Sequence, residues 1–207
     1  MKPPFSITSE ILSLISKIER LIGRIESFEH PKPQPKLRKS NRVKTLQGSL
    51  AIEGNSLNLE QVTAILDGKK VIAPKNDIIE ILNANQVYET LTELDLQNSQ
   101  HLLETHGIMM KSLLPDAGKW RTSNVGIMKQ ETVSHLAPPP DRVPFLMEDL
   151  FQFLHGDDHL LIQGCVFHYE FEFIHPFSDG NGRIGRFWHS LLLYHFHPIF
   201  ELSLIHI

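Results

Sequence analysis

One stretch of the sequence, residues 175–186, combines groups that together could act on a polyphosphate. It reads His-Pro-Phe-Ser-Asp-Gly-Asn-Gly-Arg-Ile-Gly-Arg. His175 is the only side chain of this stretch that can carry a proton near neutral pH. Asp179 offers a carboxylate oxygen, the kind of ligand that Mg²⁺ prefers. The stretch therefore supplies a candidate base and a candidate metal ligand.

The same stretch supplies groups that bind an anion. Gly180 and Gly182 give the backbone freedom where a helix must begin, and the start of a helix attracts negative charge. Arg183 and Arg186 are three residues apart, so we expect them to point from one helix face toward the same anion. A helix–turn–helix connection with solvated charges is the alternative interpretation. It explains neither the histidine nor the spacing of the arginines.

Helices on both sides must position this stretch. Apolar residues recur with helical periodicity over 160–174 and over 187–196. Pro176 restricts His175 to extended geometry, so we expect the first helix to close there. Cys165 lies within the first apolar run, where we expect it to be buried. Because it is the only cysteine, the chain has no intramolecular disulfide.

The stretch resembles the signature of the Fic family, HPFx(D/E)GNGRxxR, and fills every specified position. The resemblance covers about residues 42–200 and implies a mostly α-helical bundle with a small β-hairpin. It implies a protein adenylyltransferase, which moves AMP from ATP to a Ser, Thr or Tyr hydroxyl of a target protein. His175 would take the hydroxyl proton, Asp179 would hold Mg²⁺, and Phe177 would anchor the loop in the core. The residues expected to bind the phosphates of ATP are Gly180, Asn181, Gly182, Arg183 and Arg186.

Within that phosphate-binding set, three side chains have separate expected partners. The amide of Asn181 would donate to a phosphate oxygen. Arg183 would neutralise the β-phosphate region and Arg186 the γ-phosphate, each as a bidentate donor.

A second motif of the same family lies upstream, near the end of a helix expected over about 42–54. Residues 49–54, Ser-Leu-Ala-Ile-Glu-Gly, match (S/T)xxxE(G/N), the inhibitory segment of autoregulated Fic proteins. The inhibitory residues would be Ser49, Glu53 and Gly54. A Glu53 carboxylate paired with Arg186 would take the place of the γ-phosphate and leave ATP misaligned, so we expect a nearly silent resting enzyme. A capped helix with a solvated Glu53 is the alternative interpretation.

Two other functions stay open. The same site could remove AMP, with Glu53 orienting a water molecule, or transfer a phosphoryl group or another nucleotide. Gly182 argues against the phosphotransferase branch, whose motif differs at that position. The third hypothesis is a non-catalytic nucleotide-sensing adaptor, and the complete constellation of residues 175–186 argues against it.

The rest of the chain reads as an arm and a domain. Residues 1–35 are expected to form a helical arm, with an apolar stripe over 7–25, and a Pro-rich linker over 30–39. We favour packing of the stripe on the body of the protein; pairing with a second copy, as a homodimer, is the alternative. Residues 36–207 are expected to form the Fic domain.

Within that domain we expect helices over 58–68, 77–94, 99–114 and 143–155 and a hairpin between 115 and 140. The 58–68 helix begins at a capping-box pattern. The resemblance implies that the hairpin is a flap that holds the target segment by backbone pairing. His101 and His106 have no Cys or acid at metal-ligand spacing, so we expect core or surface histidines.

Composition excludes several classes of protein. The 207 residues are 41% hydrophobic and 21% charged, with a formal net charge of -4, so no basic field points to nucleic acid. No apolar run is long enough for a membrane span and the start is not a signal peptide, so we expect a cytoplasmic protein. The expected partners are ATP, a target protein and the chain itself, through self-modification. Residues 196–207 end in an apolar run without a polar cap, which suggests a truncated C-terminus.

Overall fold

The computed structural model describes residues 3–27, 35–129 and 132–202, and the chain is mostly helical over these residues. The helices are α1 (Ser9–Ser27), α2 (Pro35–Ile52), α3 (Leu59–Leu66), α4 (Lys75–Glu89), α5 (Ser99–Met109), α6 (Val143–Phe153), α7 (Leu160–Ile174) and α8 (Asn181–Phe196). Short 3₁₀ helices are η1 (Leu91–Glu93), η2 (Pro140–Arg142) and η3 (Pro198–Leu202). The prediction of a mostly α fold is confirmed.

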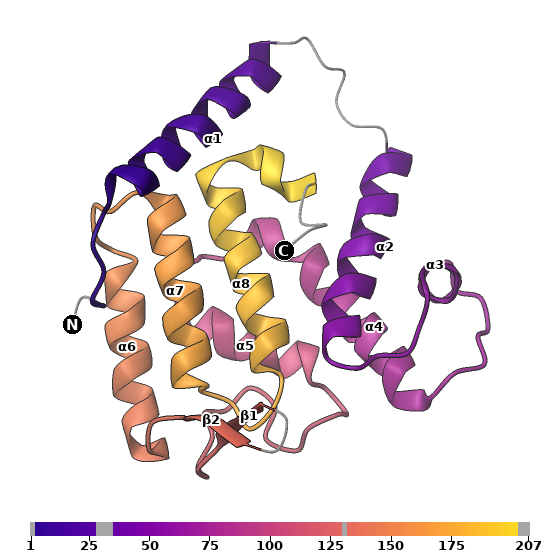
Figure 1. The fold of residues 1–207 in the computed structure, drawn as a ribbon. Coiled ribbons are helices and arrows are strands. Elements are labelled where there is room, and N and C mark those ends of the chain that lie inside the picture. Colours follow the sequence, from indigo (N-terminus) through magenta and orange to yellow (C-terminus); the bar gives the residue numbers. More distant parts are fainter. Residues whose placement is uncertain (1–2, 28–34, 130–131, 203–207) are drawn as a thin grey trace.

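Helices α7 and α8 form the centre of the bundle and pack along each other, with α6 on the other side of α7 (Figure 1). Their contact is made by large aromatic side chains that have no exposed surface. These are Phe167 and Phe171 of α7, Phe187 and Trp188 of α8, and Phe177 of the loop between them. Each such side chain contributes about 1.5–3 kcal/mol by burial. The prediction that Phe177 anchors the loop in the core is confirmed.

Helix α2 packs against α3 and α4 through a second buried cluster. Its members are Val43, Leu46 and Leu50 of α2, Val62 and Ile65 of α3, Ile81 and Ala84 of α4, and Leu57. Helix α3 begins at a capping box, in which the side chains of Asn58 and Gln61 accept from each other's backbone N–H groups. The predicted capping box is confirmed. The cluster fixes the orientation of α2 relative to the rest of the domain.

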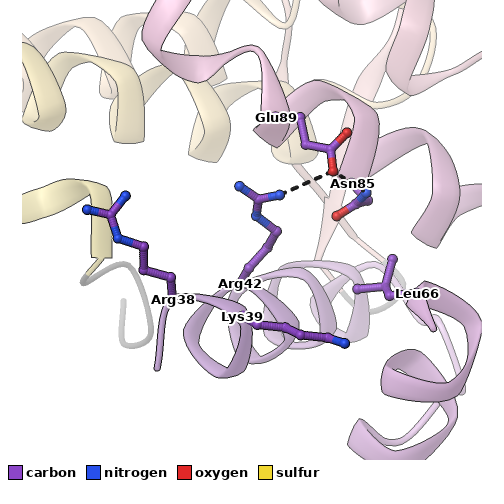
Figure 2. A pocket seen from close by; sticks show the side chains of 6 residues that line it. All are labelled: Arg38, Lys39, Arg42, Leu66, Asn85 and Glu89. Atoms are coloured by element: carbon purple, nitrogen blue, oxygen red, sulfur yellow. Dashed lines mark hydrogen bonds and ion pairs between the residues drawn. The ribbon is translucent and has the colours of Figure 1, made fainter. Parts of the chain in front are cut away.

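Ion pairs fasten the first half of α2 to the same two helices. Lys39 pairs with Asp67, the C-cap of α3, and Arg42 Nη1 lies 3.2 Å from Glu89 Oε1 at the end of α4. Figure 2 shows Lys39, Arg42 and Glu89 around a pocket of about 350 Å³ that Arg38, Leu66 and Asn85 also line. Carboxylates thus pair with both cations, and because these side chains keep exposed surface, the ion pairs contribute little to the packing of α2.

Several boundaries differ from the predicted ones. Helix α2 begins at Pro35, inside the predicted linker, because proline is tolerated in the first turn of a helix; linker residues 30–34 lie outside the described part. Helix α5 ends at Met109 and not at 114, and Ser112 has a left-handed φ of 63° that cannot continue a helix. Cys165, predicted to be buried, is exposed, because the buried face of α7 passes through its neighbour Gly164.

Helix α1 lies along one end of the bundle (Figure 1). Ile22 is buried, and Phe5, just before α1, packs edge-on against Phe153 of α6 at 5.9 Å between ring centroids. Glu19 and Glu26 pair with His159 and His197 at 3.3 and 2.9 Å. The prediction that the arm packs on the body is confirmed for these contacts. The exposed face of α1 carries Leu12, Leu14, Leu21 and Ile25, and pairing of this face with a second copy stays a prediction.

Strands β1 (Gly126–Lys129) and β2 (Thr132–Leu136) pair antiparallel between α5 and α6 in the chain. Gly126 pairs with Leu136, and the register shifts by one residue between Ile127 and Met128, which is the signature of a β-bulge. Bulges bend a strand and often lie next to binding sites. The part played by this pair of strands in binding a target stays a prediction.

No helix within residues 3–27, 35–129 and 132–202 is long and apolar enough to cross a membrane.

Candidate active site

The connection between α7 and α8 turns at His175, the C-cap of α7. His175 has φ 50° and ψ 62°, the left-handed region, and its N–H donates to the carbonyl of Phe171 at 2.9 Å. The prediction of extended geometry from Pro176 is therefore wrong. The left-handed conformation is a common helix ending, although it costs about 1–2 kcal/mol in a residue with a side chain. The surrounding contacts override the local preference of the residue before a proline.

One contact of the His175 ring bears on its tautomer. The ring Nδ1 lies 3.4 Å from the carbonyl oxygen of Glu172, one turn earlier on α7. A carbonyl can only accept, so this contact favours the tautomer with its proton on Nδ1. The lone pair then resides on Nε2.

The loop is closed by the side chain of Asn181, which is buried in the first turn of α8. Its Oδ1 accepts from the N–H of Phe177 at 2.9 Å, and its Nδ2 donates to the carbonyl of Phe177 at 2.8 Å. The loop uses one of the two N–H donors on Nδ2, so the expected bond from this amide to a phosphate oxygen stays a prediction. A buried amide needs partners, and the loop backbone supplies two of them.

His106, for which the sequence left a core and a surface position open, supports the same loop. The ring of His106 is fully buried and stacks on Phe177, with 3.7 Å between ring centroids. The N–H of Gly118 donates to its Nδ1 at 2.8 Å, so the proton lies on Nε2, which donates to the carbonyl of Asp179 at 3.0 Å. Burial lowers the pKa of His106, which agrees with a neutral ring. Of the two expected positions, core or surface, His106 thus takes the core one, and its contact with the loop was not foreseen.

Helix α8 begins at Gly180, its N-cap, with a left-handed φ of 81°. A Cβ at this position would lie 2.7 Å from Sδ of Met110, so only glycine fits. The first-turn N–H groups of Asn181, Gly182 and Arg183 follow, and such groups have no partner within the helix. The loop therefore ends in a glycine turn and a helix start, which together suit an anion.

Asp179 precedes the start of α8, and most of its side-chain surface is exposed to solvent. Its Oδ1 accepts from the N–H of Gly180 at 2.6 Å and from Arg183 Nη2 at 3.1 Å, while its side chain is 61% exposed. No group of three or more His, Cys, Asp or Glu residues that could hold a metal occurs within the described ranges. Mg²⁺ commonly uses one or two carboxylates together with substrate phosphates, so a single exposed carboxylate beside an anion site fits nucleotide-bound Mg²⁺.

The two motif arginines have different partners. Arg183 is buried at 5% exposure, and its Nη1 lies 2.7 Å from Glu80 Oε1 of α4. Its Nε has no hydrogen-bond partner among the described residues. Arg183 and Arg186 thus contact different carboxylates in this structure, and their expected convergence on one anion stays a prediction. Positions three apart differ by about 60° around a helix, enough for one side chain to enter the core beside α4.

Arg186 contacts the end of α2. Its Nη2 lies 2.7 Å from Glu53 Oε1 and donates to the carbonyl of Ser49 at 2.9 Å, while its Nε donates to Ser49 Oγ at 3.0 Å. Gly54, which follows, has a left-handed φ of 93° and ends the helix. The Glu53 carboxylate also lies so close to Gly182 that a Cβ there would overlap it. The two sequence motifs, far apart in the chain, thus meet at Arg186.

A second carboxylate, also not foreseen from the sequence, lies beside this ion pair. Glu172 of α7 packs against Gly185 so closely that a Cβ there would overlap its carboxylate. Burial raises the pKa of Glu172 to about 6; the nearby Arg186 acts to lower it and Glu53 to raise it. Arg186 therefore lies between two acidic side chains, of which Glu53 is the one bonded to it.

Comparisons with known proteins agree with this architecture. The model of the Fic/DOC family matches residues 94–193. The protein adenylyltransferase fic-1 of Caenorhabditis elegans is 28% identical over 204 residues, which make up 87% of this chain and 39% of that protein. The chain thus spans well under half the length of this relative.

Solved structures give the same result. A Fic family protein from Desulfovibrio desulfuricans matches with a TM-score of 0.90 at 44% identity, over 98% of this chain and 62% of that one. A Fic-domain-containing signalling protein from Bacteroides thetaiotaomicron shares the fold, with a TM-score of 0.76 at 21% identity, over 86% of this chain and 73% of that one.

Proposed function

We propose that the chain, whose residues 94–193 match the model of the Fic/DOC family, is a member of that family and a protein adenylyltransferase. It would move AMP from ATP to a Ser, Thr or Tyr hydroxyl of a target protein. The observation that carries the proposal is the loop between α7 and α8. There a histidine, an exposed carboxylate and the start of α8 are fixed by the buried Phe177 and Asn181.

His175 is the proposed catalytic base. Its Nε2 would take the proton of the target hydroxyl while that oxygen attacks the α-phosphorus of ATP and the bond to the pyrophosphate breaks. The Nδ1 contact with the carbonyl of Glu172 favours the tautomer that this role requires. The proton resides on His175 at the end of the step, and pyrophosphate is the leaving group.

The start of α8 is the proposed phosphate site. The backbone N–H groups of Gly180, Asn181 and Gly182 and the positive end of the helix would bind phosphate oxygens. Arg183 would lie beside the β-phosphate region and Arg186 beside the γ-phosphate. Asp179 would hold Mg²⁺, which neutralises charge on the phosphates when bound.

Inhibition by the end of α2 is part of the proposal. The Glu53 carboxylate forms an ion pair with the guanidinium of Arg186, which we assign to the γ-phosphate, and Ser49 accepts two hydrogen bonds from the same guanidinium. ATP that enters without this partner would meet like charge from Glu53 and bind with its α-phosphate misaligned. Gly54 would allow the chain to leave α2 directly after the inhibitory residue.

The remaining parts have proposed roles of their own. The β1–β2 hairpin would act as a flap that holds an extended segment of the target, since strand edges bind peptides by backbone pairing. Residues 1–35 would form an arm separate in function from the Fic domain of residues 36–207.

A second candidate activity is removal of AMP from a modified protein. The observation that favours it is that Glu53 lies within the site, 2.7 Å from Arg186, where a carboxylate could orient a water molecule. Under this hypothesis Glu53→Gly abolishes the activity, whereas under the main proposal it raises AMP transfer.

Labelled ATP separates these reactions. Incubation with candidate target proteins should transfer label from [α-³²P]ATP and none from [γ-³²P]ATP. His175→Ala should bind ATP as the wild type does and transfer nothing. Transfer of γ-label would show a phosphotransferase, and the absence of any transfer by both the wild type and Glu53→Gly would refute the proposed function.

A further inference from the structure

Arg121 is a buried charge that the motifs do not include. It lies before the hairpin, is 2% exposed, and is among the largest fully buried side chains of the described residues. Its guanidinium donates to four backbone carbonyls: those of His175 (from Nε, 2.7 Å), Ser123 (from Nη1, 2.9 Å), Pro138 (from Nη2, 2.6 Å) and Ile174 (from Nη2, 3.2 Å). Within the described ranges no carboxylate pairs with it.

The end of α7 explains how this charge can be buried. Ile174 is the last residue of α7 and His175 is its C-cap, so their carbonyls lie at the negative end of the helix and need donors from outside it. A guanidinium presents several N–H donors in one plane and remains charged. Arg121 therefore caps α7, and the negative end of the helix compensates its charge, as a carboxylate usually does.

The other two carbonyls lie on either side of the hairpin. Ser123 precedes β1 and Pro138 follows β2, and the N–H of Ala137 donates to the carbonyl of Val125 at 3.2 Å between them. The backbone N–H of Arg121 also donates to the carbonyl of Pro176 at 2.9 Å. One side chain thus joins the entry of the hairpin, its exit and the backbone of the loop that carries His175.

We propose that Arg121 is a positioning residue, which holds His175 in its left-handed conformation and fixes the base of the hairpin relative to the imidazole. This inference rests on the proposed function, because it assigns Arg121 to the alignment of the base with a target hydroxyl presented along the hairpin. Arg121 touches neither the reacting atoms nor the phosphate site. Its loss should therefore slow the transfer step and leave nucleotide binding almost unchanged.

The kinetic test uses Arg121→Gln and Arg121→Lys, both measured in the wild type and in Glu53→Gly. Displacement of a catalytic group by about 1 Å can lower a rate roughly 100-fold. We expect Arg121→Gln to lower kcat at least about tenfold while the Kd for Mg²⁺-ATP changes less than about threefold. Arg121→Lys should restore part of the rate, since it keeps the charge but not the planar arrangement of donors.

Gln163→Leu is the matched control. Gln163 of α7 is 1% exposed and donates to the carbonyls of Phe153, the last residue of α6, at 3.4 Å and of Gly156 at 2.9 Å, so it too caps a helix end, away from the loop. It should lower the melting temperature and leave kcat unchanged. A folded Arg121→Gln with wild-type kcat would overturn the proposal. So would an equal loss of kcat in Gln163→Leu, because the effect would then reflect stability alone.

Two measurements by nuclear magnetic resonance do not depend on activity. The ¹³C-labelled ring of His175 should change its chemical shift and its titration midpoint in the Arg121 variants and keep both in Gln163→Leu. In the wild type, the Nε proton of Arg121 should exchange with solvent very slowly, at a rate like that of the most protected backbone amides. An unchanged His175 ring in a folded Arg121 variant would overturn the assignment. So would fast exchange of the Arg121 proton, which is measured on the wild type even if no variant of Arg121 folds. If no α-label is transferred in any variant, the proposed function fails, while these two readouts still decide the role of Arg121.

Discussion

Replacing Glu53 by glycine removes the carboxylate that occupies Arg186, and the structure sets the size of the effect. Of the contacts that Arg186 makes with α2, this variant removes the 2.7 Å ion pair and leaves both bonds to Ser49. The side chains of Arg186 and Glu53 are 18% and 28% exposed, so the pair is partly desolvated. A hydrogen bond to a charged group of this kind contributes about 1.5–3 kcal/mol.

Before ATP can engage Arg186 in the wild type, this free energy must be supplied. At 1.36 kcal/mol for each factor of ten, its removal should raise AMP transfer roughly 10- to 150-fold. Glu53→Gln, which keeps the shape and loses the charge, should fall between the two proteins. The free energy of unfolding should drop by only about 1–2 kcal/mol, because Ser49 still bonds the guanidinium that loses its partner.

Self-labelling with [α-³²P]ATP measures the effect in four proteins: the wild type, Glu53→Gly, Arg186→Ala and the double variant. The double variant should behave as Arg186→Ala does, since the group that Glu53 blocks is then absent. Glu60→Gln, an exposed carboxylate change on α3, is the control and should label as the wild type does. If Glu53→Gly binds ATP normally yet labels no more than the wild type, Glu53 is a helix carboxylate without an inhibitory role.

Three further predictions address single groups. Asp179→Ala should weaken binding of Mg²⁺-ATP much more than binding of metal-free ATP in calorimetry, and equal losses would contradict a metal role. Gly180→Ala should lower the free energy of unfolding by about 2–4 kcal/mol in urea titration, because its φ is 81° and the new methyl group meets Met110; an unchanged midpoint would contradict this. The pKa of Glu172 is raised from 4.5 to about 6 in the folded protein. Between these two pH values the folded protein therefore keeps the Glu172 proton, whereas the unfolded chain has lost it. Stability should therefore fall as pH rises through this window, by about 2 kcal/mol in all, and Glu172→Gln should remove that slope.

Local sequence signals predicted the elements that flank the site. The apolar periodicity over 160–174 matches α7 residue for residue, and the capping box of Asn58 and Gln61 forms as expected. These features depend on neighbours in the chain, which the sequence displays directly. Helix α2 was expected from 42 but begins at Pro35, since its first half is held by ion pairs to α3 and α4 that its own composition does not reveal.

Contacts between distant segments account for what the sequence did not predict. His106 and Arg121 hold the loop through backbone carbonyls, and a carbonyl has no residue type by which a pattern could be recognised. Arg183 pairs with Glu80, an ordinary helix residue whose position becomes significant only when α4 meets α8. Asn181 belongs to the motif, yet its amide closes the loop on Phe177 because a buried amide needs partners. The motif therefore predicted which residues form the site better than it predicted what each of them contacts.

The continuity of α2 gives the inhibitory contact a mechanical property. One uninterrupted helix joins Lys39, fastened to Asp67, with the end that presents Glu53 to Arg186. At a rise of 1.5 Å per residue these points are about 21 Å apart, so a tilt of about 10° around the Lys39 end displaces the Glu53 end by roughly 4 Å. That movement exceeds the reach of a hydrogen bond. A small change in the tilt of α2, produced far from the loop of His175, is thus enough to separate the Glu53 carboxylate from Arg186.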